Sequence, residues 1–130
     1  MGAQTVAKAA AAMTLAGALA VGAGAEAFAS SANWMGSWTT NGNGSGQKTG
    51  SHSVSKGQHF LHFGVKGNGA RSFTATVYKE APGKDPAIQT VTGKDKNVEY
   101  MAPWKSYSAG KYYVVFTYSV KGKKAFGGVQ

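Results

Sequence analysis

The chain has 130 residues, which is enough for one domain and too few for two of ordinary size. It contains no cysteine, and this excludes a disulfide framework, a lipoprotein attachment site and a thiol nucleophile. Basic residues outnumber acidic ones by 14 to 5, for a formal net charge of +9. Such a balance favours anionic partners, although it also serves solubility.

The first 29 residues have the pattern of a secretory signal peptide. A short start with Lys8 as its only charge precedes an uncharged run of alanine, glycine, leucine and valine over residues 9–23. Residues 27–29 (Ala-Phe-Ala) have the small-x-small form of a cleavage site, and residues 25–27 are a second candidate. The alternative is a retained membrane anchor, but spanning a bilayer needs about 20 strongly apolar residues. We expect a signal peptide of bacterial type that is cleaved after Ala29, and hence a secreted, extracellular protein.

The mature part, residues 30–130, begins with a predicted strand over residues 33–40. Trp34 and Trp38 fall on one face of this strand, and the small Gly36 leaves space between the two indoles. A loop rich in glycine, asparagine and serine follows over residues 41–50, and a short strand is predicted near residues 51–55.

Residues 58–66 and 71–79 form the clearest pair of strands in this half of the chain. Apolar and polar residues alternate along the second strand, and Leu61, Phe63 and Val65 share a face of the first. The Gly-Asn-Gly between them supplies the positive φ values of a tight turn. The spacing therefore predicts a β-hairpin.

The second half is organised around residues 110–121, which are almost entirely β-branched or aromatic. Two prolines place a loop at residues 80–86, and weaker strands are predicted at residues 87–92 and 98–102. Residues 110–121 form a predicted central strand, and residues 125–129 a last edge strand. The residues of the central strand expected to face the core are Tyr112, Val114, Phe116, Tyr118 and Val120.

No mature segment shows helical periodicity, and many short strands alternate with glycine-rich turns. This pattern predicts an all-β, antiparallel two-sheet β-sandwich of roughly seven or eight strands. A small β-barrel is the alternative. Neither a repeat nor a second domain is evident, and we expect a monomer.

Catalytic and metal-binding constellations are weak. His59 and His62 are three residues apart, which places them on opposite faces of a strand. A zinc site also needs a third or fourth ligand, and only four acidic residues of the mature part could supply a carboxylate. No serine lies in a Gly-x-Ser-x-Gly elbow. We predict no catalytic residue, no metal and no cofactor, hence a protein that is not an enzyme.

The binding signal is lysine together with a few aromatic residues. Arg71 is the only arginine, and lysine is a hydrated point charge suited to diffuse attraction rather than to a tailored phosphate pocket. The lysines concentrate at predicted turns and strand ends. Trp104 and Tyr107 flank Lys105 in a connection expected to be exposed. The candidate binding residues are Trp104, Lys105, Tyr107, Lys121, Lys123 and Lys124.

These features predict a secreted, cationic, non-enzymatic binding protein that acts at an anionic cell-envelope surface, either a wall polymer or a membrane. Antimicrobial action is one form that such binding could take. Two alternatives remain: an extracellular inhibitor or structural module whose charge is incidental, and a carbohydrate-binding module that uses exposed aromatic residues. No specific nucleic-acid partner is expected. A domain of charge +9 attracts nucleic acid non-specifically, so binding to nucleic acid would not by itself indicate the function.

Overall fold

The computed structural model describes residues 19–21 and 34–130, and these residues form β-strands joined by turns and loops. The segments are β1 (Leu19–Val21), β2 (Trp34–Asn41), β3 (Gln47–Lys48), β4 (His52–Val54), β5 (Gly57–His59), β6 (Leu61–Val65), β7 (Ser72–Lys79), β8 (Ala87–Lys94), β9 (Glu99–Met101), β10 (Lys105–Tyr107), β11 (Gly110–Thr117) and β12 (Lys121–Val129).

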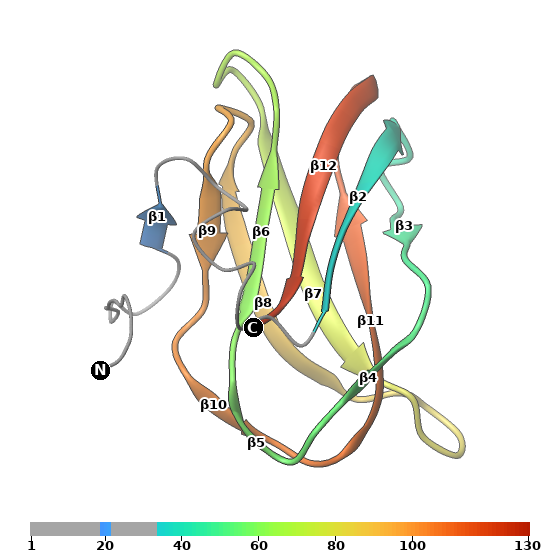
Figure 1. Cartoon of the computed structure of the whole chain (residues 1–130). Coiled ribbons are helices and arrows are strands. Elements are labelled where there is room, and N and C mark those ends of the chain that lie inside the picture. Colours follow the sequence, from blue (N-terminus) through green and yellow to red (C-terminus); the bar gives the residue numbers. More distant parts are fainter. Residues whose placement is uncertain (1–18, 22–33) are drawn as a thin grey trace.

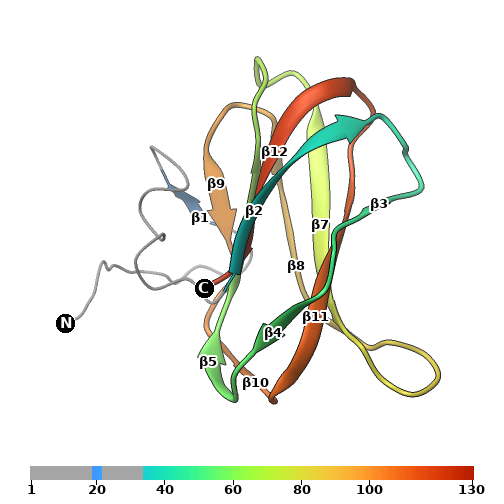
Figure 2. The same ribbon diagram turned by 45° about the vertical axis from the view of Figure 1, so that its right-hand side comes forward.

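The strands form multiple antiparallel sheets, and the arrangement is consistent with a β-sandwich (Figures 1 and 2). The first sheet has the order β1-β9-β6-β12-β2. The second has the order β3-β11-β7-β8, and β4 also pairs with β11. A two-stranded ribbon of β5 and β10 lies at the lower end in Figure 1. All recorded strand pairs are antiparallel, as predicted.

Aromatic rings fill the centre of the core between the two sheets. The ring of Phe63 on β6 lies 5.0 Å from that of Phe116 on β11, measured between centroids. Trp38 stacks nearly parallel to Phe63 at 5.9 Å, and Phe73 lies 5.8 Å from Phe63 on another side. Because Phe63, Phe73 and Phe116 are almost fully buried, this cluster supplies much of the apolar area that stabilises the fold.

β11 has the interior position that the sequence predicts, between β7 and the short strands β3 and β4. Tyr112, Val114, Phe116 and Tyr118 are buried in the core cluster, and Val120 packs against it half-buried. The predicted inward residues are therefore confirmed, but β11 ends at Thr117, so Tyr118 and Val120 lie in the turn to β12 and not in the strand. Trp34 belongs to the same buried cluster, and Trp38 packs against it half-buried.

β12 depends on two glycines for its place between β2 and β6. Gly127 and Gly128 have φ of 151° and 153°, a backbone conformation that residues with a side chain rarely adopt. A Cβ on Gly128 would lie 2.0 Å from the carbonyl oxygen of Trp34, and one on Gly127 would lie 2.2 Å from that of His62. Only glycine allows β12 to approach both neighbours this closely.

Two predictions about strand partners are wrong. Residues 58–66 and 71–79 do not form a hairpin, because β6 belongs to the first sheet and β7 to the second. The turn between them crosses from one sheet to the other. The alternation of apolar and polar residues cannot distinguish this crossing from a hairpin, because each strand buries one face in either arrangement. Residues 125–129 are not an edge strand either, because β12 has partners on both sides.

The number of strands also exceeds the predicted seven or eight. The predicted strand at residues 58–66 is divided at Phe60 into β5 and β6, and several other strands contain only two or three residues. Of the predicted signal peptide, only β1 is described, and it pairs with β9 at the edge of the first sheet. The remaining residues of that segment lie outside the described residues, so the signal peptide stays a prediction.

Candidate functional site

Seven of the thirteen described cations lie at one end of the domain, the upper end in Figure 1, where no acidic side chain is exposed. The segments that meet there are the turn from β6 to β7, the turn from β8 to β9 and the beginning of β12. We call this surface the basic end. Its cations are all exposed, and they are Lys66, Arg71, Lys94, Lys96, Lys121, Lys123 and Lys124.

Backbone contacts bring these segments together from distant parts of the chain. The amide of Lys66 donates to the carbonyl of Lys124 at 2.9 Å, which joins the turn after β6 to β12. On the second sheet, Lys94 lies opposite Ser72, the residue after Arg71. The end therefore carries positive charge on the rims of both sheets.

Asp95 fixes the centre of the basic end. One carboxylate oxygen accepts the backbone N–H of Arg71 at 3.0 Å, and the other accepts the hydroxyl of Tyr118. The Asp95 carbonyl also accepts the N–H of Gly69 at 2.8 Å. These hydrogen bonds join the turn after β6 to the turn after β8. Because Asp95 is buried, its carboxylate presents little negative charge to solvent.

The pKa values of this pair follow from these contacts. Desolvation acts to raise the pKa of Asp95, but the hydrogen bonds from Tyr118 and from the Arg71 amide outweigh it and hold the pKa below the usual value. Burial and the same bond raise the pKa of Tyr118 to about 12. Asp95 is thus ionised at neutral pH, and its charge partly compensates the repulsion among the cations above it.

The opposite end of the sandwich has a more even balance of charge. Its cations are Lys48, Lys56, Lys79, Lys84, Lys105 and Lys111, and two acidic residues, Glu80 and Asp85, lie among them. Glu80 accepts a hydrogen bond from Ser51, and Asp85 accepts one from the hydroxyl of Tyr113. The fourth described acid, Glu99, is fully buried beside His62 and does not contribute to either end.

The six predicted binding residues do not form one site. Trp104 lies between β9 and β10, with its ring 4.6 Å from that of Phe60 and edge-on to it. The carbonyl of Phe60 accepts a hydrogen bond from the backbone N–H of Gln130, the residue that follows β12. Lys121, Lys123 and Lys124 lie at the other end of β12, so about 20 Å separates them from Trp104.

Tyr107 is not a surface residue, contrary to the prediction. Its side chain is 2 % exposed, and its hydroxyl donates to Oε1 of Gln89 at 2.7 Å. Burial of the ring raises the pKa of Tyr107 strongly. Its ring packs 5.5 Å from that of His59 and 5.2 Å from that of Tyr112, whereas Lys105 and Ser106 of the same strand are exposed.

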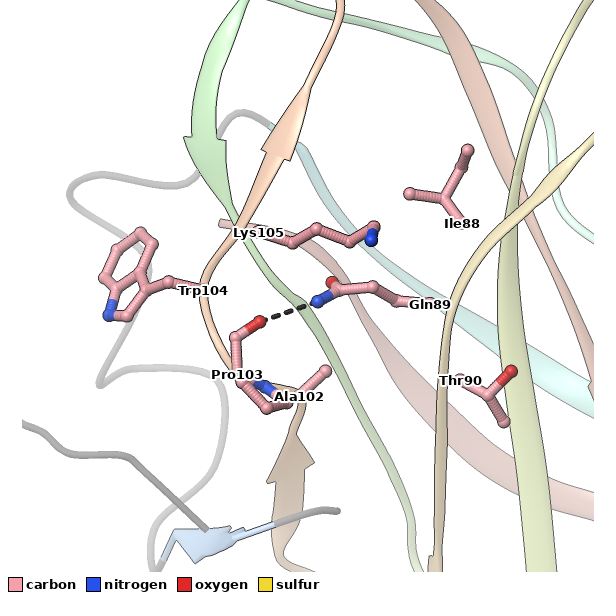
Figure 3. Close-up of a pocket in the computed structure, with 7 residues that line it drawn as sticks. All are labelled: Ile88, Gln89, Thr90, Ala102, Pro103, Trp104 and Lys105. Carbon is pink, nitrogen blue, oxygen red and sulfur yellow. Dashed lines mark hydrogen bonds between the residues drawn. The ribbon is translucent and has the colours of Figure 1, made fainter. Parts of the chain in front are cut away.

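Trp104, by contrast, is exposed to 55 % and is the only large hydrophobic side chain recorded as exposed in the described part of the chain. It borders a shallow groove of about 380 Å³ formed by residues 88–90 of β8 and residues 102–105. Gln89 spans the groove by donating to the Pro103 carbonyl at 2.6 Å. In Figure 3 the indole points away from Gln89 and Lys105, so these polar groups do not converge on its face.

The histidines have separate surroundings. His59 has its two ring nitrogens 3.0 Å from the carbonyl oxygen of Gln130 and 2.8 Å from that of Ser55. His62 lies 3.1 Å from the carboxylate of Glu99, and both side chains are fully buried. Within residues 34–130 no three histidine, aspartate or glutamate side chains are grouped in a way that could hold a metal.

Comparison with protein families, with curated proteins and with solved structures found no match to this chain. The described residues include no helix of the length and apolar character needed to cross a membrane. The geometry of the molecule is therefore the basis for any proposal about its function.

Four members of the basic end were not among the predicted site residues: Lys66, Arg71, Lys94 and Lys96. Each lies at a predicted turn, and that is the only signal the sequence carries for them. Which turns meet depends on the order of strands in two sheets, and this order is set by pairings between distant segments.

Proposed function

We propose that this chain is a secreted, cationic, non-enzymatic binding protein that acts at an anionic surface of the cell envelope through its basic end. One observation carries the proposal: seven exposed cations gather at one end, where the only described acidic residue, Asp95, is buried. An incidental surplus of lysine, as in an inhibitor or structural module, would be expected to spread more evenly.

The spacing of these cations favours joint action. Neighbouring strands lie about 5 Å apart, which is less than the screening length of about 8 Å at physiological ionic strength. Cations on adjacent strands therefore add their potentials at the surface of a partner.

The charge at the basic end is testable by substitution. We expect the variant with Lys121, Lys123 and Lys124 replaced by Gln to bind anionic vesicles at low salt more weakly than the parent, by about 3 kcal/mol. The reason is that each lysine near such a surface contributes about 1 kcal/mol. The melting temperature should not change, because the three side chains are exposed. Co-sedimentation with phosphatidylglycerol vesicles, with neutral phosphatidylcholine vesicles as a blank, measures the effect.

A matched control comes from the opposite end. Lys56, Lys84 and Lys111 are exposed as well, and replacing them by Gln removes the same total charge. We expect this variant to bind more tightly than the basic-end variant. Equal losses in the two variants would show that only net charge matters, and absence of binding by the parent at low salt would exclude the proposed role.

A carbohydrate-binding module is the second candidate, because exposed tryptophan stacks well on sugar rings and Trp104 is more than half exposed. Salt separates the two candidates. Binding driven by lysine weakens as salt rises, whereas stacking on Trp104 is nearly independent of salt. The direction of the indole, away from Gln89 and Lys105, favours the first candidate.

Export has its own expected result. We expect N-terminal sequencing of the secreted protein to begin at Ser30, or at Phe28 if the second cleavage site is used, because small residues precede both positions. Secreted protein that retains Met1 would contradict the signal peptide.

A further inference from the structure

Resting on the proposed function of the basic end, we infer that its partner is a flexible anionic polymer chain and not a lipid bilayer. The sequence leaves these two partners open. Three features of the basic end distinguish them: how its cations are spread, how free their charged groups are, and which side chains lie between them.

The cations are spread over both sheets. Lys66 and Lys124 lie on the first sheet, joined by a backbone hydrogen bond, and Arg71 and Lys94 lie on the second. Packed sheets are separated by about 10 Å. A small anion therefore contacts only a few of these cations at once, whereas a polymer chain can cross the end and contact those of both sheets together.

The charged groups are free to follow such a chain. Within residues 34–130, none of the six lysines at the basic end forms an ion pair or a side-chain hydrogen bond, and the guanidinium of Arg71 donates only to Ser119, at 3.3 Å. The nearest carboxylate, that of Asp95, is occupied by Tyr118 and by the Arg71 amide. Such an arrangement lacks the fixed, convergent donors of a site built for a single phosphate.

The side chains between the cations are small or polar. Residues 67–70 are Gly-Asn-Gly-Ala, and Gly122 separates Lys121 from Lys123. The exposed Trp104 lies about 20 Å away, near the last residues of β12. Peripheral binding to a bilayer that persists at physiological salt combines charge with buried apolar area, and the basic end offers only charge.

Binding to three probes tests this inference: long-chain inorganic polyphosphate, inorganic tripolyphosphate and phosphatidylglycerol vesicles. We expect the parent to bind the long polymer at least ten-fold more tightly than tripolyphosphate, because only the long chain can contact all seven cations together. Seven contacts predict a slope of log K against log salt near −5 for a flexible chain, and the Lys121, Lys123 and Lys124 to Gln variant should reduce its magnitude by about 2. The control variant at Lys56, Lys84 and Lys111 should leave the slope close to that of the parent.

With vesicles we expect binding at low salt that is lost at about 0.15 M salt, without a blue shift of tryptophan emission. Vesicle binding that persists at that salt with a blue shift absent from Trp104→Phe would overturn the inference in favour of a bilayer. Equal affinity for tripolyphosphate and the long polymer would overturn it in favour of a compact anion site. Both results leave the proposed function intact, whereas failure of every anionic probe at low salt would remove the proposed function itself.

Discussion

Replacing Phe116 by Ala is expected to reduce the free energy of unfolding by about 3–5 kcal/mol. The ring is 1 % exposed and lies in the middle of β11, at 5.0 Å from the ring of Phe63 and 6.2 Å from that of Trp38. Truncation removes the contact between the two sheets at their centre and leaves a cavity that surrounding strands cannot fill without losing their register. Urea denaturation followed by tryptophan fluorescence measures the shift of the midpoint.

Val115→Thr is the matched control, because Val115 is the neighbouring residue on the opposite face of β11 and is only half-buried. Its replacement should cost about 1 kcal/mol or less. If the two variants unfold at the same urea concentration, the assignment of the inward face of β11 is wrong.

Gly128→Ala is expected to destabilise the domain by more than about 4 kcal/mol, which is at the extreme of single substitutions. Two effects combine at this position. The backbone has φ of 153°, and the new Cβ would meet the carbonyl oxygen of Trp34 at 2.0 Å and its carbon at 2.8 Å. Relief requires β2 to move away from β12, and this would break pairing over the length of both strands. Loss of soluble protein or a large shift in the urea midpoint is the expected observation.

Gly122→Ala separates strain from collision. Gly122 also lies in β12 and also has a positive φ, 85°, but a Cβ there would meet nothing within 4 Å. Its replacement should therefore cost only the backbone strain, about 1–3 kcal/mol. If Gly122→Ala proves as destabilising as Gly128→Ala, the close approach of β2 is not the reason that position 128 requires glycine.

Local chemistry predicted the strands well, and the pairing between them poorly. The alternation at residues 110–121 identified the buried face of β11, since a strand with one apolar face has only one way to bury it. The turn at residues 66–71 was misinterpreted because its Gly-Asn-Gly suits any sharp reversal. It is a crossing between sheets because β6 pairs with β9 and β12 whereas β7 pairs with β8 and β11, and no local pattern predicts these distant pairings.

The same limit applied to the candidate site. Lysine at turns was evident from the sequence, and Lys121, Lys123 and Lys124 do lie at the basic end. Trp104 was correctly expected to be exposed, but Tyr107, three residues later, is buried under β5 and hydrogen-bonded to Gln89. Proximity in sequence suggested a single site, whereas the nine-residue strand β12 separates the lysines from Trp104.

The central place of β12 in the first sheet bears on how the chain folds. The backbone amide of Lys123 donates to the hydroxyl of Thr40, 83 residues earlier, and β12 lies between β2 and β6. Domains dominated by such distant pairings fold in milliseconds to seconds, far more slowly than helical ones. Until β12 pairs with β2 and β6, the apolar faces of these strands are exposed and can associate with other partly folded chains. The lysines that surround the turns carry the same sign on every copy, so their mutual repulsion keeps those chains apart during this interval.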